Sequence, residues 1–161
     1  MSNPVDLDPR EFAATLEILK KIDFLVDVPD DQLKGILFSL QKESFSAKKT
    51  ILFQGEIANR MFIIRKGDVS ITTKNKGAKL HLADLAPPAY FGEISLLRPT
   101  SATATATAGE QGADLLILTH EAMARLAKTL PDIHQKIQTT IEKRIESKQK
   151  AKREEDSSEI A

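Results

Sequence analysis

The stretch YFGEISLLRPTSAT, residues 90–103, is the part of this sequence that decides the fold. An aromatic pair is followed by a glycine, an acidic residue and a short apolar run that Pro99 ends. This order predicts a strand that stops at Gly92 and a short helical turn that begins at Glu93. The first amides of such a turn are free donors with partial positive charge, so they are suited to holding an anion. Gly92 allows close approach to the backbone, and Glu93 is suited to accepting a hydroxyl hydrogen bond beside that anion.

The chain around this stretch, from about residue 43 to residue 118, is patterned as short strands. Turns rich in Gly, Pro and Asn separate the apolar runs 50–53, 61–64, 69–73, 80–82 and 115–118. Lys66–Asp68 and Asn75–Gly77 predict two of the turns. Residues 101–108 alternate hydroxyl side chains with alanine, which predicts a strand with one packed face. Several short strands at this spacing are typical of a β barrel or sandwich.

Helical patterns flank the strands on both sides. Before them, apolar residues recur every three or four positions, and a second short helix is expected to begin at Asp30. After them, Pro131 is suited to the first turn of a helix whose apolar stripe is Ile133, Ile137, Ile141 and Ile145. A step of four residues turns this stripe by about 40°, so we expect the helix to lie across its own domain. A coiled-coil register would place Arg144 on the seam.

Composition excludes several classes of protein. The chain has 161 residues, with 23 basic against 23 acidic residues, and no cysteine, which excludes disulfides and thiolate chemistry. His81, His120 and His134 fall in three different elements, so no metal site is expected. Nucleophile-elbow and Walker motifs are missing, so we expect no enzyme and no catalytic residues. Balanced charge and the lack of tryptophan disfavour nucleic-acid binding, and no apolar segment predicts membrane insertion.

The motifs together resemble the cyclic-nucleotide-binding domain family. Residues 91–97, Pro99 and residues 101–103 resemble its phosphate-binding cassette, and residues 51–56 and 61–69 resemble its strands and glycine turns. The resemblance implies a mainly β fold, a jelly-roll-like β-roll with N-terminal helices and a C-terminal lid helix. The expected organisation is a helical lead-in over 1–42, a β-roll over 43–118 with its cassette at 91–103, C-terminal helices over 119–147, and a charged, disordered tail over 148–161.

What the resemblance implies for function is a small regulatory protein of the cytoplasm that senses a cyclic mononucleotide, cAMP rather than cGMP. It implies that Glu93 accepts a hydrogen bond from the ribose 2′-hydroxyl and that the last helix relays occupancy to a protein partner. The resemblance leaves open whether the chain forms a homodimer. No cofactor is implied other than this ligand. The expected ligand-binding residues are Phe91, Gly92, Glu93, Ile94, Ser95, Arg98, Thr100 and Ser101.

The cassette departs from the family pattern at its most important position. Thr100 stands where the family has its phosphate-binding arginine, and Pro88 stands where it has a glycine. Only Arg98 separates Leu97 from Pro99, a shorter segment than usual. A guanidinium–phosphate contact is worth about 1.5–3 kcal/mol, so we expect weakened affinity unless Arg98 turns inward. The alternative is a nucleotide-blind domain that serves as a protein-docking scaffold.

Overall fold

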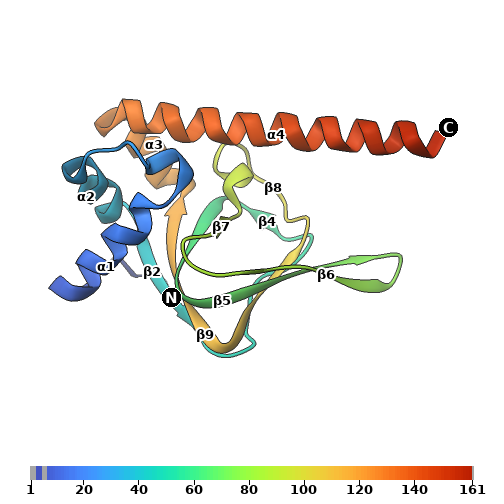
Figure 1. Cartoon of the computed structure of the whole chain (residues 1–161), viewed down its shortest axis with the longest axis horizontal. Coiled ribbons are helices and arrows are strands. Elements are labelled where there is room, and N and C mark those ends of the chain that lie inside the picture. Colours follow the sequence, from blue (N-terminus) through green and yellow to red (C-terminus); the bar gives the residue numbers. More distant parts are fainter. Residues whose placement is uncertain (1–2, 5–6, 161) are drawn as a thin grey trace.

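The computed structural model describes residues 3–4 and 7–160 (Figure 1). Most strands lie between two N-terminal and two C-terminal α-helices. In chain order the elements are β1 Asn3–Pro4, α1 Pro9–Lys20, the 3₁₀ turn η1 Asp23–Leu25, α2 Asp30–Phe38, β2 Gln41–Phe45, β3 Thr50–Leu52, β4 Ile57–Ala58, β5 Arg60–Asn75, β6 Ala78–Leu85, β7 Tyr90–Phe91, the 3₁₀ turn η2 Glu93–Leu96, β8 Thr100–Ser101, β9 Thr105–Thr119, α3 His120–Thr129 and α4 Pro131–Ile160.

Two long antiparallel strands, β5 and β9, form the spine of the sheet. The edge of β9 that faces away from β5 pairs with β2 and β3. The edge of β5 that faces away from β9 pairs with β7 and β6. The short strands β4 and β8 pair separately. The curled sheet and the helices packed against one end of it confirm the predicted fold class, mainly β with flanking helices in a β-roll (Figure 1).

The prediction of two strands separated by a turn at Lys66–Asp68 was wrong. The segment is one strand, β5, whose register with β9 shifts on either side of Gly67. Gly67 has φ of +79°, and a Cβ there would lie 2.2 Å from the carbonyl oxygen of Gly112. Gly67 therefore bends a continuous strand at a bulge, where only a glycine fits, and does not reverse the chain.

The predicted strand over 101–108 is interrupted. β8 ends at Ser101 and β9 begins at Thr105. The alternation holds from that point, with Ala106 and Ala108 buried. The backbone of Ala102 instead bonds to the loop before β4: its amide donates to the Glu56 carbonyl, and its carbonyl accepts from the Gly55 amide.

The sheet separates two apolar cores. Alternate residues of β5 face opposite sides, so Met61 and Ile63 belong to the core under the helices, while Phe62 and Ile64 belong to the core inside the roll. The helix-side core also contains the buried faces of all four α-helices and of η1. One strand thus builds both cores.

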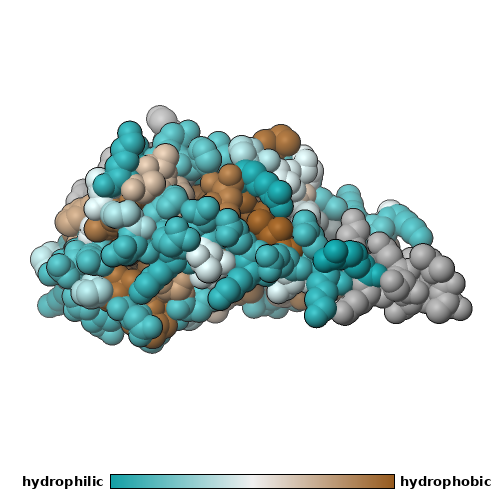
Figure 2. All heavy atoms as spheres, turned by 90° about the horizontal axis from the view of Figure 1, so that it is seen from above, coloured by the Kyte–Doolittle hydropathy of each residue, from teal (hydrophilic) through white to brown (hydrophobic). Residues whose placement is uncertain are grey.

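The last helix, α4, crosses the roll and runs past it (Figure 1). Ile133, Ile137 and Ile141 are each 1% exposed and Ile145 is partly buried, which confirms that this stripe packs on the domain. Seen from above, the surface is mostly hydrophilic (Figure 2). The segment from residue 148, expected as a disordered tail, continues the helix to Ile160. No Gly or Pro follows Pro131, and Lys, Arg, Glu, Gln and Ala are strong helix formers, so helical propensity extends beyond the packed stripe.

Within the described residues, no helix is long and apolar enough to cross a membrane.

Candidate functional site

The predicted strand, glycine and helical turn are present between β7 and β8. β7 pairs with β5, with Phe91 opposite Phe62, and η2 follows Gly92 directly. Gly92 is left-handed, with φ of +79°, and a Cβ there would lie 2.9 Å from the Arg60 carbonyl oxygen. Only glycine allows the backbone to turn this sharply against β5.

The turn is held from three directions. Ser95 is buried, and its hydroxyl lies 2.7 Å from the Gly92 carbonyl oxygen and 3.0 Å from that of Arg60. His120, the first residue of α3, places Nδ1 2.8 Å from the Leu96 carbonyl oxygen, so this nitrogen donates. Ile94 packs toward the helix-side core. These contacts tie the cassette to β5 on one side and to the C-terminal helices on the other.

Glu93 is buried, although it is charged. Its side chain is 12% exposed, and Oε1 lies 3.4 Å from Nη1 of Arg144, on α4. A buried carboxylate is costly without a charged or hydrogen-bonding partner. Arg144 supplies that partner from 51 residues farther along the chain. The group that the family resemblance assigns to the ribose is therefore joined directly to the last helix.

Arg144 also joins the N-terminal helices. Its Nη2 donates to Asp23 at 2.9 Å, and its guanidinium lies 4.7 Å from the centre of the Tyr90 ring. The Tyr90 hydroxyl donates to Asp23, 2.9 Å away, and its ring meets Phe24 edge-on at 5.3 Å. One guanidinium thus connects α4, the cassette and η1 through two carboxylates and a ring.

The surroundings shift the pKa values of two groups in this cluster. Burial and then the hydrogen bond to Asp23 raise the pKa of Tyr90, so the phenol stays neutral and remains a donor. Burial acts to lower the pKa of Arg144, but Tyr90, Asp23 and Glu93 together outweigh it and raise that pKa. Arg144 therefore keeps its charge.

The core inside the roll is apolar beside the cassette, and some of the residues packed on it are partly exposed. Phe91 stacks on Phe62, with ring centres 4.9 Å apart and an interplanar angle of 16°. Ile71, Leu85 and Ala102 pack on the roll core, yet each remains partly exposed. An apolar wall beside hydrogen-bonding groups suits a flat ligand with one polar end.

The structure brings five of the eight predicted ligand residues together and leaves three apart. Residues 91–95 form the turn; Glu93 and Ser95 are buried there, and the other three are partly buried. Arg98, Thr100 and Ser101 are exposed on the segment that leads into β8. Arg98 is exposed, and within the described residues no side-chain hydrogen bond or ion pair engages it.

Sequence reasoning missed Asp23, Tyr90 and Arg144 as parts of the site. One signal was available for Arg144, since it lies three residues after Ile141 on the packed side of α4. A charged residue on a buried face implies a charged partner. Nothing local in the sequence identified which carboxylates would meet it.

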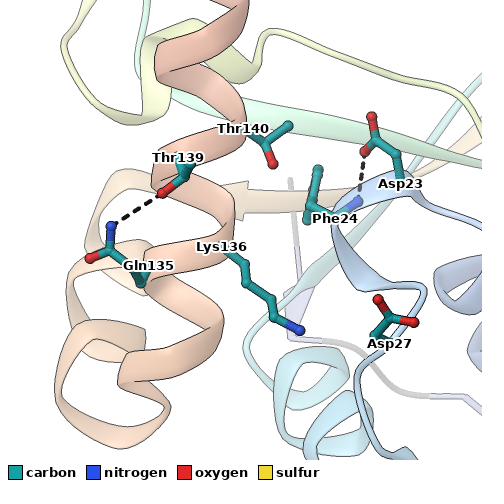
Figure 3. A pocket seen from close by; sticks show the side chains of 7 residues that line it. All are labelled: Asp23, Phe24, Asp27, Gln135, Lys136, Thr139 and Thr140. Atoms are coloured by element: carbon teal, nitrogen blue, oxygen red, sulfur yellow. Dashed lines mark hydrogen bonds between the residues drawn. The ribbon is translucent and has the colours of Figure 1, made fainter.

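A groove borders this cluster between η1 and α4 (Figure 3). Its volume is about 290 Å³, and its lining is polar apart from Phe24. Lys136 extends from α4 toward the η1 side, where Asp23 and Asp27 lie. Within the described residues, no group of three or more His, Cys, Asp or Glu side chains could hold a metal ion.

Comparison with known proteins gives a consistent result. The family model described as "Cyclic nucleotide-binding domain" matches residues 42–129. The chain is 28% identical over 95 residues to the cAMP-dependent protein kinase type II regulatory subunit of Drosophila melanogaster, covering 58% of this chain and 25% of that protein. It is 26% identical over 125 residues to the cGMP-dependent protein kinase, isozyme 1, of the same fly, covering 76% and 16%.

A solved structure shows the same fold. A cyclic nucleotide-binding domain from Methylobacillus flagellatus superposes with a TM-score of 0.74 at 18% identity, over 88% of this chain and 80% of that one. The chain spans a quarter or less of the two kinase-related proteins. Their kinase names therefore describe much larger proteins, whereas the matched part is a binding domain.

Proposed function

Because the chain belongs to the cyclic nucleotide-binding domain family, we propose that it is a non-enzymatic regulatory module that binds a cyclic mononucleotide and relays occupancy through α4. The ribose hydroxyl of the ligand would donate to Glu93, and its phosphate would lie against the turn that begins at Gly92. The base would rest on the apolar inner wall of the roll that includes Phe91.

The observation that carries this proposal is the contact between Glu93 and Arg144. The carboxylate has a single charged partner in the described residues, and that partner belongs to α4. A ligand hydroxyl that donates a hydrogen bond to Glu93 would alter the ion pair between Glu93 and Arg144 directly, with no residue between the ligand and α4. Arg144 holds Asp23 and Tyr90 as well, so the change reaches η1 at the same step.

We propose that affinity is reduced relative to a cassette with its arginine. Thr100 is exposed and offers a hydroxyl without charge. The loss of one guanidinium–phosphate contact corresponds to about 1.5–3 kcal/mol, roughly ten- to a hundredfold in affinity. cAMP is our preferred ligand over cGMP, because Ser101 is exposed on β8 and gives no reason to favour guanine.

The same contact favours one alternative function. Glu93 is already paired with Arg144, as expected for a domain in which α4 has taken the place of a ligand. Such a domain would present α4 to a protein partner permanently. The two functions share the fold and differ only in whether a nucleotide competes for Glu93.

Calorimetric titration with cAMP and cGMP separates them. We expect binding that is weakened at least tenfold by Glu93→Gln and left unchanged by Glu110→Gln, a matched loss of charge at an exposed residue of β9. Hydrogen exchange within residues 131–147 should change on binding. No binding heat with either nucleotide, together with unchanged exchange, would establish the scaffold in place of the sensor.

A further inference from the structure

Thr100 supplies no positive charge to the cassette, and three of the other arginines are poorly placed to replace the family's arginine. Arg65 is 4% exposed at its side chain and is paired with Asp114 at 3.0 Å. Arg144 is held by two carboxylates, which neutralise it. Arg98 is exposed at the end of the turn. A replacement arginine would have to face the roll and have no acidic partner.

Arg60, the first residue of β5, meets both conditions. It shares its side of the strand with Phe62 and Ile64, which belong to the core inside the roll. Its guanidinium carbon lies 5.2 Å from the centre of the Phe62 ring, so the side chain is folded over that ring. Among the described residues, no carboxylate lies within ion-pair distance of it, and the residue is half-buried.

The cassette is built directly on this residue. The Arg60 carbonyl oxygen accepts from the Ser95 hydroxyl at 3.0 Å and faces Gly92. The ring that carries the guanidinium also borders the turn, since Phe62 Cδ2 lies 3.5 Å from the position of a Cβ on Gly92. The guanidinium and the turn therefore share one aromatic neighbour.

The pairing of β4 with β8 also places Arg60 near position 100, where the family has its arginine. Thr100 on β8 is paired with Ala58 on β4, two residues before Arg60. Two residues of extended chain span about 7 Å, and an arginine side chain is long enough to cover that distance. Positions 60 and 100 thus lie on neighbouring parts of the backbone.

We infer that Arg60 binds the anionic phosphate of the ligand in place of the missing cassette arginine. This inference rests on the proposed function and names the residue that would supply the positive charge for the phosphate. On binding, the guanidinium exchanges the Phe62 ring for phosphate oxygens, which its forked donors bind in pairs. A cation over an aromatic ring is held weakly compared with one on a phosphate, so this exchange is favourable.

A set of variants tests this assignment by calorimetry with cAMP and, separately, with cGMP. Arg60→Gln should weaken binding at least tenfold and reduce its dependence on salt. Arg60→Lys, which keeps the charge and the stem, should restore part of the affinity and shows that the site tolerates substitution. Arg125→Gln, the same change at an exposed residue of α3, is the control. Thr100→Arg should rescue Arg60→Gln by at least tenfold and should help the native chain less.

Each result decides a separate point. Native binding that Arg60→Gln leaves intact, or that Arg98→Gln weakens instead, overturns the role of Arg60 and leaves the proposed function standing. If the native chain does not bind but Thr100→Arg does, the cassette is competent and Arg60 is not the replacement. If neither binds, the proposed function fails and the role of Arg60 fails with it.

Discussion

Arg144→Gln should loosen α4 from the cassette and from η1 at once. The substitution removes the partner of Glu93, whose side chain is 12% exposed, and that of Asp23, which is 55% exposed. It also removes the cation over the Tyr90 ring. Because three separate contacts end on one guanidinium, this half-buried residue in the middle of α4 should matter more for stability than an ordinary charged residue of a long helix.

The magnitude follows from the burial of each partner. The contact with Glu93 is worth about 1 kcal/mol, below the usual range for a hydrogen bond to a charged group, because Arg144 is 38% exposed and the two atoms are 3.4 Å apart. The contact with Asp23 is worth about 0.5 kcal/mol at that exposure, and the ring contact about 0.5–1 kcal/mol. We expect a loss of about 2 kcal/mol, which lowers the melting temperature by roughly 4–8 °C in a chain of this size.

Thermal and urea unfolding followed by circular dichroism measures this loss. Lys143→Gln removes the same charge from the preceding residue of α4, which is exposed. It should change the free energy of unfolding by less than about 0.5 kcal/mol. The difference between the two variants should shrink at high salt, because partly exposed charges are screened. Equal stability of the two variants would refute the conclusion that Arg144 connects the three elements.

Three further predictions concern the turn, the last helix and the phenol. Gly92→Ala should lower the free energy of unfolding by about 2–3 kcal/mol. Gly77→Ala should lower it only by the left-handed strain of about 1–2 kcal/mol, since a Cβ there meets nothing within 4 Å. Urea unfolding compares the two variants, and equal losses would mean that the contact of Gly92 with β5 is unimportant. Truncation after Ser147 should leave the melting temperature nearly unchanged. Truncation after Leu130 removes three isoleucines that are 1% exposed, each worth about 1.5–3 kcal/mol, and should cause a large drop in the melting temperature or aggregation. If the protein truncated after Leu130 were equally stable, α4 would contribute nothing to the core. Tyr90 is the only tyrosine, so tyrosinate absorbance during alkaline titration reports on it alone. Because folding raises its pKa, the neutral phenol stabilises the fold fully below about pH 10, and this contribution is lost as pH rises through the folded-state pKa. A titration at the unfolded value would contradict both the burial of the phenol and its hydrogen bond to Asp23.

Much of the fold could be predicted because its signals are local. The glycine and acidic residue at the start of η2, the proline at the start of α4 and the isoleucine stripe each act within a few residues. β5 was divided wrongly because a Lys-Gly-Asp sequence is as typical of a turn as of a bulge. Only the pairing with β9, which continues on both sides of Gly67, distinguishes the two, and pairing partners are not encoded locally.

The site could be predicted only in its backbone. Residues 91–95 form one continuous segment, so a sequence motif captures them. The charges around the turn come from distant segments: Arg144 meets Glu93 across 51 residues and Asp23 across 121. Arg60 carries no local signal beyond the alternation of its strand. These side chains are brought together by the packing of α4 and η1 on the sheet, which no single stretch of sequence describes.

The wall between the two cores is one backbone thick. Phe62 is bonded on either side to Met61 and Ile63, and these two side chains point into the opposite core. The packing inside the roll and the packing beneath the helices therefore depend on the same few peptide units of β5.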